Sequence, residues 1–327
     1  MEDSYNREID YVRIAVTDRC NLRCFYCMPL QGIEYEPKEN ILSYEEIIRL
    51  LIILSDIGFK KVRFTGGEPF VRKDFISLLE KVSKLNLYDS IHITSNGTML
   101  SKHIPKLKEL GVNKINLSLD SLSPERFEKI TRRNDFEKVI KTLYRLLDEG
   151  FTVKINAVVM NGINTEDIIP LTELTKENNI DLRFIEEMPF NGGSKKNIKI
   201  FNARDIEKTL RENYSISKDV ISNHGETSTN YIIPGFKGKV GIIPAFSRTF
   251  CNTCNRLRIT AKGEIKTCLY DNGVFSIREL IRSGSSNKEI KAKFIELIKF
   301  KPENGFEAEK NIKNKSFRKE SMSSIGG

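Results

Sequence analysis

The chain has 327 residues, which is enough for one large domain or for a large domain with a smaller one. Its formal net charge of +9 suits an anionic ligand or a nucleic acid, although a lysine-rich solvated surface would give the same excess. The first residues are polar, and the longest early aliphatic run, residues 50–54, is far too short to cross a bilayer. We therefore expect no secretory leader, no membrane association and a cytoplasmic protein with reduced cysteines.

Predicted strands and helices alternate from residue 11 to about residue 190. Apolar residues at helical spacing predict a helix over about 43–58, and it opens with Ser43-Tyr44-Glu45-Glu46, which has the form of a capping box. A second helix is predicted over about 135–149, with Gly150 at its end. Strands that alternate with helices in this way predict a parallel sheet. The strands are expected at about 11–17, 60–65, 90–94, 113–119, 152–159 and 181–186.

Polar residues alternate with apolar ones along these strands, whereas a parallel sheet covered on both faces reads as nearly continuous aliphatic sequence. Helices on the apolar face would leave the other face as a polar lumen, and cations buried there would need a charged ligand. The alternative is a one-sided sheet that faces water. About six such units predict an α/β fold with a partial, open TIM-like barrel, whose site lies at the carboxyl ends of the strands. The polar positions are Arg13, Thr17, Lys61, Arg63, Thr65, His92, Thr94, Asn116, Ser118, Asp120, Lys154, Asn156 and Arg183.

The pattern changes after about residue 190, so we predict a first domain over 1–190 and a smaller C-terminal domain over 191–327. A polar stretch precedes a predicted helix near 203–213, and short strands with turn residues follow it. Further helices are expected at about 274–282 and 286–299, and roughly the last 25 residues read as weakly structured. We expect the smaller domain to close the open side of the barrel.

All six cysteines fall into two triplets. The first follows the first predicted strand with the spacing C-x3-C-x2-C and comprises Cys20, Cys24 and Cys27. Structural zinc usually takes two C-x2-C pairs, so this triplet fits a four-iron cluster that lacks one protein ligand better than a structural metal knuckle. The iron without a thiolate can bind a small molecule, which indicates a reactive site. Three unrelated thiols are the remaining alternative.

The second triplet also lacks a fourth thiolate and comprises Cys251, Cys254 and Cys268. A zinc site would need an outside ligand, and His224 is the only nearby histidine, so a second cluster with one open iron fits better. Between these cysteines, Arg256 and Arg258 lie on one face of an extended segment, which suits bidentate contacts to phosphate.

A glycine pair, Gly66 and Gly67, follows the second predicted strand and would let the backbone approach a ligand closely, while Glu68 offers a carboxylate to an ammonium group. A plain turn is the more common reason for such a pair. Together with the first triplet, however, this segment resembles the radical S-adenosylmethionine (SAM) enzymes. Residues 17–24, 63–69, 94–97, 116–120 and 183–186, the second triplet and the Gly326-Gly327 end resemble the molybdenum cofactor biosynthesis protein A family of GTP 3′,8-cyclases over essentially the whole chain.

This resemblance implies the first step of molybdenum cofactor biosynthesis. The triplets would hold two [4Fe-4S] clusters, and SAM at the first cluster would be cleaved to methionine and a 5′-deoxyadenosyl radical. The radical would take the C3′ hydrogen of GTP, and closure onto C8 would give 3′,8-cyclo-7,8-dihydro-GTP. The implied partners are a reductant such as flavodoxin or ferredoxin and the downstream cyclic pyranopterin monophosphate synthase. A homodimer is compatible with the sequence, and no nucleic acid is expected to bind.

The resemblance also implies roles for single residues. Cys20, Cys24 and Cys27 would carry the catalytic cluster. Contacts to SAM are implied for Tyr26, Gly67, Ser118 and Met188, although Met188 would otherwise be read as a core methionine. Contacts to GTP are implied for Arg13, Arg63, Thr94, Lys154, Arg256, Leu257 and Arg258. Lys61, Thr65 and Arg183 are expected in the same shell, and the Gly326-Gly327 tail is expected to enter the pocket.

Two other functions stay open at this point. A radical SAM enzyme that modifies a peptide or another substrate would use a fully cysteine-ligated second cluster as an electron relay, and this chain has no cysteine to spare. A nucleic-acid-binding protein would gather arginine, lysine and aromatic residues on one exposed surface, whereas the cations here alternate into a sheet face.

Overall fold

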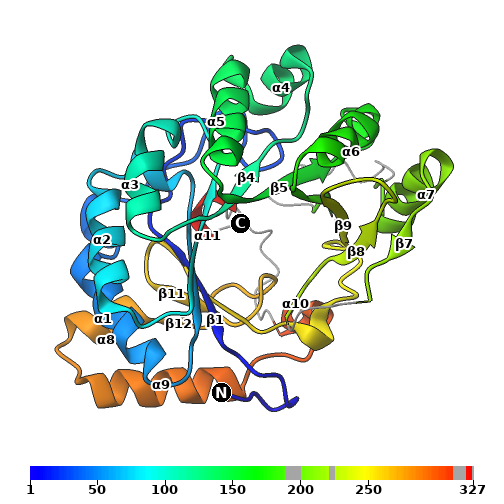
Figure 1. Ribbon diagram of the computed structural model, residues 1–327. Helices are drawn as coiled ribbons and strands as arrows, with labels where there is room; N and C mark the ends of the chain where they lie inside the picture. The colour runs from blue at the N-terminus through cyan, green and yellow to red at the C-terminus, as the bar shows by residue number, and fades with distance from the viewer. Residues whose placement is uncertain (189–199, 221–224, 312–321, 326–327) are drawn as a thin grey trace.

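The computed structural model describes residues 1–188, 200–220, 225–311 and 322–325. Its strands form one twelve-stranded sheet in the order β12-β11-β10-β1-β2-β3-β4-β5-β6-β9-β8-β7. The sheet curves round a central space, and helices lie on its outer side (Figure 1). Along these described ranges, no helix combines the length and the apolar character that a membrane crossing requires. The architecture is therefore a large, mostly parallel sheet in a mixed α/β fold, as the sequence predicts.

Six parallel strands form the middle of the sheet and follow one another in chain order. Successive side chains of a strand point to opposite faces, so each strand places its apolar residues under the helices and its polar residues toward the central space. The predicted strands are confirmed, with every end within two residues of its predicted position. They are β1 (Tyr11–Ala15), β2 (Lys61–Thr65), β3 (Ser90–Ser95), β4 (Lys114–Ser118), β5 (Thr152–Val159) and β6 (Asp181–Glu186).

The strands that follow residue 200 extend this same sheet at both edges. β10 pairs in parallel with β1, and β9 pairs in parallel with β6, while the outermost strands are antiparallel. This pairing satisfies main-chain N–H and C=O groups that β1 and β6 would otherwise expose as sheet edges. The domain boundary near residue 190 stays a prediction. The added strands are β7 (Ser217–Lys218), β8 (Thr229–Ile232), β9 (Lys239–Ile243), β10 (Arg256–Ile259), β11 (Glu264–Lys266) and β12 (Phe275–Ser276).

Helices cover the outer face of the sheet (Figure 1). Their apolar residues join those of the strands in one hydrophobic cluster, in which Leu50, Leu143 and Ile115 are completely buried. The helices of the first half are α1 (Tyr44–Ser55), α2 (Phe75–Leu85), α3 (Ile104–Glu109), α4 (Pro124–Thr131), α5 (Phe136–Asp148) and α6 (Ile168–Glu177). Those of the second half are α7 (Ala203–Asn213), α8 (Ile277–Arg282) and α9 (Asn287–Lys299). Short 3-10 turns are η1 (Lys38–Asn40), η2 (Pro69–Val71), η3 (Ser101–His103), η4 (Thr165–Asp167) and η5 (Cys251–Thr253).

Local sequence signals explain where these helices begin. The Ser43 hydroxyl accepts a hydrogen bond from the Glu46 amide at 3.1 Å, and the Glu46 carboxylate accepts one from the Ser43 amide at 2.7 Å. This is the predicted capping box, which satisfies amides that a helix start leaves unpaired. α8 begins later than the predicted residue 274, because Phe275 and Ser276 pair with β11 as the short strand β12.

The end of the chain carries more regular structure than the sequence predicts. α10 (Gly305–Lys310) and α11 (Met322–Ile325) are helical, and α11 lies beside β1 near the middle of the molecule (Figure 1). Ile325 is only 1% exposed, and burial of this apolar side chain favours the docked position of α11. The Gly326-Gly327 tail, the polar stretch 191–197 and His224 lie outside the described residues.

Candidate active site

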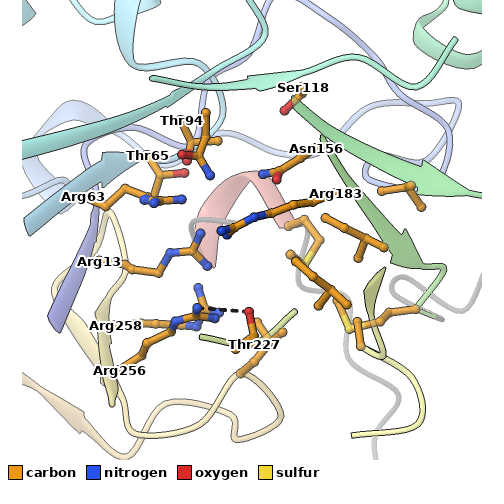
Figure 2. Close-up of a pocket in the computed structure, with 18 of the residues that line it drawn as sticks. Arg13, Arg63, Thr65, Thr94, Ser118, Asn156, Arg183, Thr227, Arg256 and Arg258 are labelled. Carbon is orange, nitrogen blue, oxygen red and sulfur yellow. Dashed lines mark hydrogen bonds between the residues drawn. The ribbon is translucent and has the colours of Figure 1, made fainter. Parts of the chain in front are cut away.

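The inner face of the sheet lines a cavity of about 600 Å³. Polar side chains from every strand between β1 and β6, and from β10, reach into it, which confirms the predicted polar lumen and rejects the one-sided sheet. Strand register sets them in layers, since Arg13 lies opposite both Arg63 and Arg258. Figure 2 shows arginines from β1, β2, β6 and β10 pointing toward the same space.

Both cysteine triplets line this one cavity. The first follows β1 at the carboxyl ends of the parallel strands. The second is divided between η5 and the segment after β11, and it reaches the cavity because β10 pairs with β1. Two groups of thiols that lie far apart in sequence therefore share one space with the cation group.

The glycine pair holds the segment that leads to Cys20. The Gly67 amide donates to the Thr17 carbonyl at 2.9 Å, and the Glu68 amide donates to the Arg19 carbonyl at 2.9 Å. A Cβ atom at Gly67 would lie 2.2 Å from the Arg19 carbonyl oxygen, which is far inside contact distance. Close approach of two main chains thus requires glycine here. Gly67 also lines the cavity, and its contact with SAM stays a prediction.

The expected use of the Glu68 carboxylate is not supported. Its side chain is completely buried, and its two oxygens accept hydrogen bonds from the Ser95 hydroxyl at 2.9 Å and the Asn96 amide at 2.7 Å. Burial raises the pKa of Glu68 to about 7, while these hydrogen bonds oppose the rise. The carboxylate therefore orders the turn after β3 and does not face the cavity.

The thiols of the first triplet need positive charge to ionise. Burial, and then the Glu68 carboxylate, raise the pKa of Cys20 to about 12. Burial, Asp120 and the neighbouring thiols raise the pKa of Cys24 far above its usual range. Iron ions would supply the missing positive charge, so this donor set fits an iron–sulfur cluster.

Within the described residues, no three His, Cys, Asp or Glu side chains converge on one point as they would around a single ion. A four-iron cluster does not require such convergence, because each thiolate binds a different iron.

The second triplet has a different electrostatic environment. Burial would raise the pKa of Cys254, but Lys301 and Arg256 outweigh it and lower that pKa to about 7. The Lys301 ammonium donates to the Arg256 carbonyl at 3.0 Å and also to the Thr267 carbonyl, so it is fixed beside the thiols. Sequence reasoning missed Lys301, since no local pattern distinguishes it from the many surface lysines.

The cations of the cavity are costly without an anion. Burial lowers the pKa of Lys61 to about 8 and the pKa of Arg63 and of Arg258 to about 9, and neighbouring cations add to the effect. In the described part of the chain, several buried polar atoms of this space also lack a hydrogen-bond partner. They are Nε of Arg13, Arg63 and Arg256, Oγ1 of Thr94 and Oδ1 of Asn116 and Asn156. A polar, negatively charged ligand would neutralise these cations and satisfy the unpaired atoms.

Lys154 and Leu257, two residues predicted to contact GTP, differ from the other cavity residues in their surroundings. Lys154 is paired with Asp181, which also binds Arg183 at 3.0 Å, so this part of the cavity is partly neutralised. The Leu257 side chain is 1% exposed and belongs to the hydrophobic cluster, because alternation along β10 points it away from Arg256 and Arg258. Its side chain does not line the cavity.

Three further residues predicted to contact SAM belong to the same cavity. Tyr26, Ser118 and Met188 all line it. The Tyr26 hydroxyl donates to Asp120 at 2.9 Å, and the Tyr270 hydroxyl, which donates to the Ala245 carbonyl, lies 3.1 Å from the Met188 sulfur. Besides Lys301, sequence reasoning missed Tyr11 and Thr227, which both line the cavity. Arg256 donates to the Thr227 hydroxyl at 3.1 Å. Figure 2 marks this bond with a dashed line.

Comparisons with known proteins identify the family. The Radical SAM superfamily profile matches residues 14–175, and the Molybdenum Cofactor Synthesis C profile matches residues 180–307. The GTP 3′,8-cyclase of Desulforamulus reducens is 41% identical and covers 92% of this chain and 94% of its own. The chain belongs to the GTP 3′,8-cyclase family of radical SAM proteins.

Longer relatives agree with this assignment, and a solved structure shares the fold. Molybdenum cofactor biosynthesis protein 1 of Dictyostelium discoideum is 42% identical over 89% of this chain, which spans only 47% of that protein. The chain thus covers about half the length of such relatives. Streptococcus suis SuiB bound to S-adenosylmethionine superimposes with a TM-score of 0.57 at 18% identity, covering 82% of this chain and 62% of SuiB, which supports the fold alone.

Replacing Gly67 with alanine should destabilise this GTP 3′,8-cyclase family member by about 2–4 kcal/mol, because the new Cβ would collide with a carbonyl oxygen. Gly150→Ala is the matched control, since nothing lies within 4 Å of its Cβ position and only its φ of +78° is unfavourable, at about 1–2 kcal/mol. Urea titration under anaerobic conditions measures both free energies of unfolding. Equal losses would mean that the close approach to Arg19 is not required.

Proposed function

We propose that the chain is a GTP 3′,8-cyclase of molybdenum cofactor biosynthesis, which converts GTP to 3′,8-cyclo-7,8-dihydro-GTP and consumes SAM. The observation that carries this proposal is the single cavity lined by both cysteine triplets and by arginines of β1, β2 and β10. Relatives named GTP 3′,8-cyclase align with this chain over more than nine-tenths of their own length, which supports it.

The first triplet would hold a [4Fe-4S] cluster with one iron free of protein, and the second would hold another. With SAM bound, the first cluster would supply the radical that removes the C3′ hydrogen of GTP. The chain's own part is to hold SAM with Gly67, Tyr26, Ser118 and Met188, all of which line the cavity that the first triplet also lines. We further propose that the sheet acts as a partial barrel whose enclosed face excludes water from the reaction.

The cation group would hold the triphosphate. A triphosphate carries about four negative charges, and guanidinium groups form bidentate, charge-assisted bonds with phosphate. Arg13, Arg63, Arg256 and Arg258 converge in one space (Figure 2), and the first three carry an Nε atom without a partner among the described residues. Thr94 offers a hydroxyl for which the described part of the chain provides no partner. Fixing both ends of the nucleotide would orient the ribose for hydrogen abstraction. Binding would then provide the loss of translational and rotational entropy that the reaction requires.

The end of the chain is proposed to contribute to the same pocket. Met322 and Ser323 of α11 line the cavity, and Ile325, two residues after Ser323, is buried. These positions support the expectation that the following Gly326-Gly327 tail reaches the substrate, although the two glycines themselves lie outside the described residues.

The two competing functions have less support. The cations of interest face an internal cavity, whereas a nucleic-acid surface would expose them. A peptide-modifying enzyme with a fully ligated relay cluster would need a fourth cysteine near the second triplet, and the sequence has six cysteines in all.

A reductant protein, such as flavodoxin or ferredoxin, is proposed to dock beside the first triplet. A cleft of about 370 Å³ there is lined by Arg23, Arg132 and Arg133, with Leu30 next to them and 77% exposed. Arg23 donates to the carbonyls of Cys20 and of Leu22, and Arg132 donates to the Met28 carbonyl at 3.1 Å. A basic, partly apolar cleft in contact with the cysteine loop suits an acidic electron carrier. The downstream synthase and a homodimer stay predictions.

Arg133→Glu should lower the rate supported by reduced flavodoxin at least about fivefold at low salt, because the charge reversal weakens the encounter of the two proteins. The rate with dithionite, which needs no docking surface, should stay unchanged. Arg204→Glu, a charge reversal at an exposed position of α7, is the control and should leave both rates unchanged. A flavodoxin-supported rate that is the same for both variants would place the docking surface elsewhere.

The proposed reaction itself is tested with anaerobically reconstituted protein, which should hold about eight irons per chain. Incubation with GTP, SAM and dithionite should yield 5′-deoxyadenosine and a product isomeric with GTP, both detected by mass spectrometry. Cys20→Ala should abolish SAM cleavage, whereas Cys268→Ala should spare cleavage more than GTP conversion. Four irons, zinc alone or identical behaviour of the two variants would contradict the two-cluster proposal.

Arg258→Ala should weaken GTP binding about 10- to 100-fold, the value of a charge-assisted phosphate contact, and should change SAM binding less than about twofold. Equilibrium binding to the reconstituted, unreduced protein measures both affinities. Lys208→Ala, whose side chain is 75% exposed on α7, is the control and should change neither. Equal losses for GTP and SAM would instead indicate a general folding defect.

A further inference from the structure

Tyr11 is the one aromatic side chain that β1 sends into the cavity. It lies two residues before Arg13 and therefore on the same face of the strand. Its side chain lines the cavity and only 3% of the residue is exposed. Strand register places it between Lys61 of β2 and Arg256 of β10. Tyr11 thus stands among the residues to which we assign the triphosphate.

The Tyr11 ring is surrounded by positive charge. The Lys61 ammonium lies 4.7 Å from the ring centroid, and the guanidinium carbons of Arg63 and Arg256 lie 5.6 Å from it. An aromatic face attracts cations, so the ring helps to keep these groups close together while no anion is bound. A phenylalanine ring at this position would attract the cations in the same way. The ring therefore does not explain why the residue carries a hydroxyl group.

The Tyr11 hydroxyl is buried and has no hydrogen-bond partner among the described residues. Buried hydroxyl groups nearly always have a partner, because leaving one unpaired costs free energy. The hydroxyl belongs to a cavity whose arginines carry unpaired Nε atoms as well. A ligand with several acceptor oxygens would satisfy the hydroxyl and the guanidinium groups together.

We propose that the Tyr11 hydroxyl donates a hydrogen bond to the phosphate chain of GTP and that the side chain takes up a proton from solvent when the phosphates bind. This inference rests on the proposed function, since it concerns the same cavity. The uptake follows from charge. In the empty site, the surrounding cations favour the phenolate form of Tyr11. A bound phosphate group repels a phenolate and can accept a hydrogen bond only from the protonated phenol.

The surrounding cations set the pH range of this effect. Burial would raise the pKa of Tyr11, but the surrounding positive charges, with Arg63 the largest contributor, lower it to about 7. The phenol is then about half ionised at pH 7 and about nine-tenths ionised at pH 8. Because the bound state requires the proton, GTP affinity should fall by about fivefold between these two pH values from this group alone.

Other charged groups that face Tyr11 can also change their protonation when phosphate binds. From β1, β2 and β10 these are Arg13, Lys61, Arg63 and Arg256. Only Lys61 titrates in the same range, since burial lowers its pKa to about 8, and it too should gain a proton when phosphate binds. Asp10, the preceding residue, accepts a hydrogen bond from the Asn255 amide at 2.7 Å. A variant that removes only the Tyr11 hydroxyl separates its contribution from that of Lys61.

A spectroscopic experiment tests the proton uptake directly. Tyrosinate absorbs near 295 nm, the chain has no tryptophan, and cluster absorption cancels in a difference spectrum of the reconstituted protein. Inorganic triphosphate, which does not absorb there, should remove about one tyrosinate per chain at pH 8. Tyr11→Phe should show no such loss, whereas Tyr144→Phe, which changes a tyrosine that is 46% exposed on α5, should behave like the wild type. An unchanged spectrum in wild-type protein that binds triphosphate would overturn the inference.

The pH dependence of GTP binding gives the second readout. Tyr11→Phe should bind GTP about fivefold more weakly than the wild type at pH 7 and about equally at pH 8, because the wild type loses affinity as its phenol ionises. A purely structural role of Tyr11 would weaken binding equally at both pH values, and that result would overturn the inference. Wild-type protein that binds no GTP at all would instead contradict the proposed function. Iron content and melting temperature close to those of the wild type show that the variant is folded.

Discussion

Mutual repulsion among enclosed cations is the constraint on which the active cavity depends. Arg13, Arg63 and Arg258 lie side by side across three strands, with Arg63 and Arg258 buried and Arg13 half-buried. Charges of one sign in such a place are tolerated only when an anion joins them for part of the functional cycle or when the fold holds them in place. The fold therefore accepts a local cost, and the arrangement is explained by what the cavity binds.

The sheet supplies the rigidity that this arrangement needs. β10 places Arg256 and Arg258 beside β1 through main-chain pairing, so their positions do not rely on flexible loops. The two ends of the chain are also tied together near the second triplet. Arg7 donates to the Pro302 carbonyl at 2.7 Å, to the Glu303 carbonyl at 2.6 Å and to the Cys251 carbonyl at 3.0 Å. Both candidate cluster sites thus belong to one framework, which suits a reaction that must keep two centres in a fixed relation.

Much of the fold could be predicted from the sequence because its signals are local. The period of two in β1 to β6 and the capping box at Ser43 each depend on a few neighbouring residues, and the structure agrees with both. The pairing of β10 with β1 could not be predicted in this way, since it joins residues from opposite ends of the chain. The same limit explains why Lys301 and the pairing of Lys154 with Asp181 were missed. Glu68 was misjudged because its partners, Ser95 and Asn96, lie at the end of a different strand, β3.

The contact between the glycine turn and the cysteine loop has a consequence for how freely this region can change. The hydrogen bonds run between main-chain atoms, and the atoms that forbid a larger residue are carbonyl oxygens. The contact is therefore indifferent to which side chain position 19 carries, while it permits no substitution at position 67. A randomised library of this loop should keep the glycine pair constant and can vary Arg19. Main-chain contacts determine the conformation of the loop, and the cysteines supply its reactive groups.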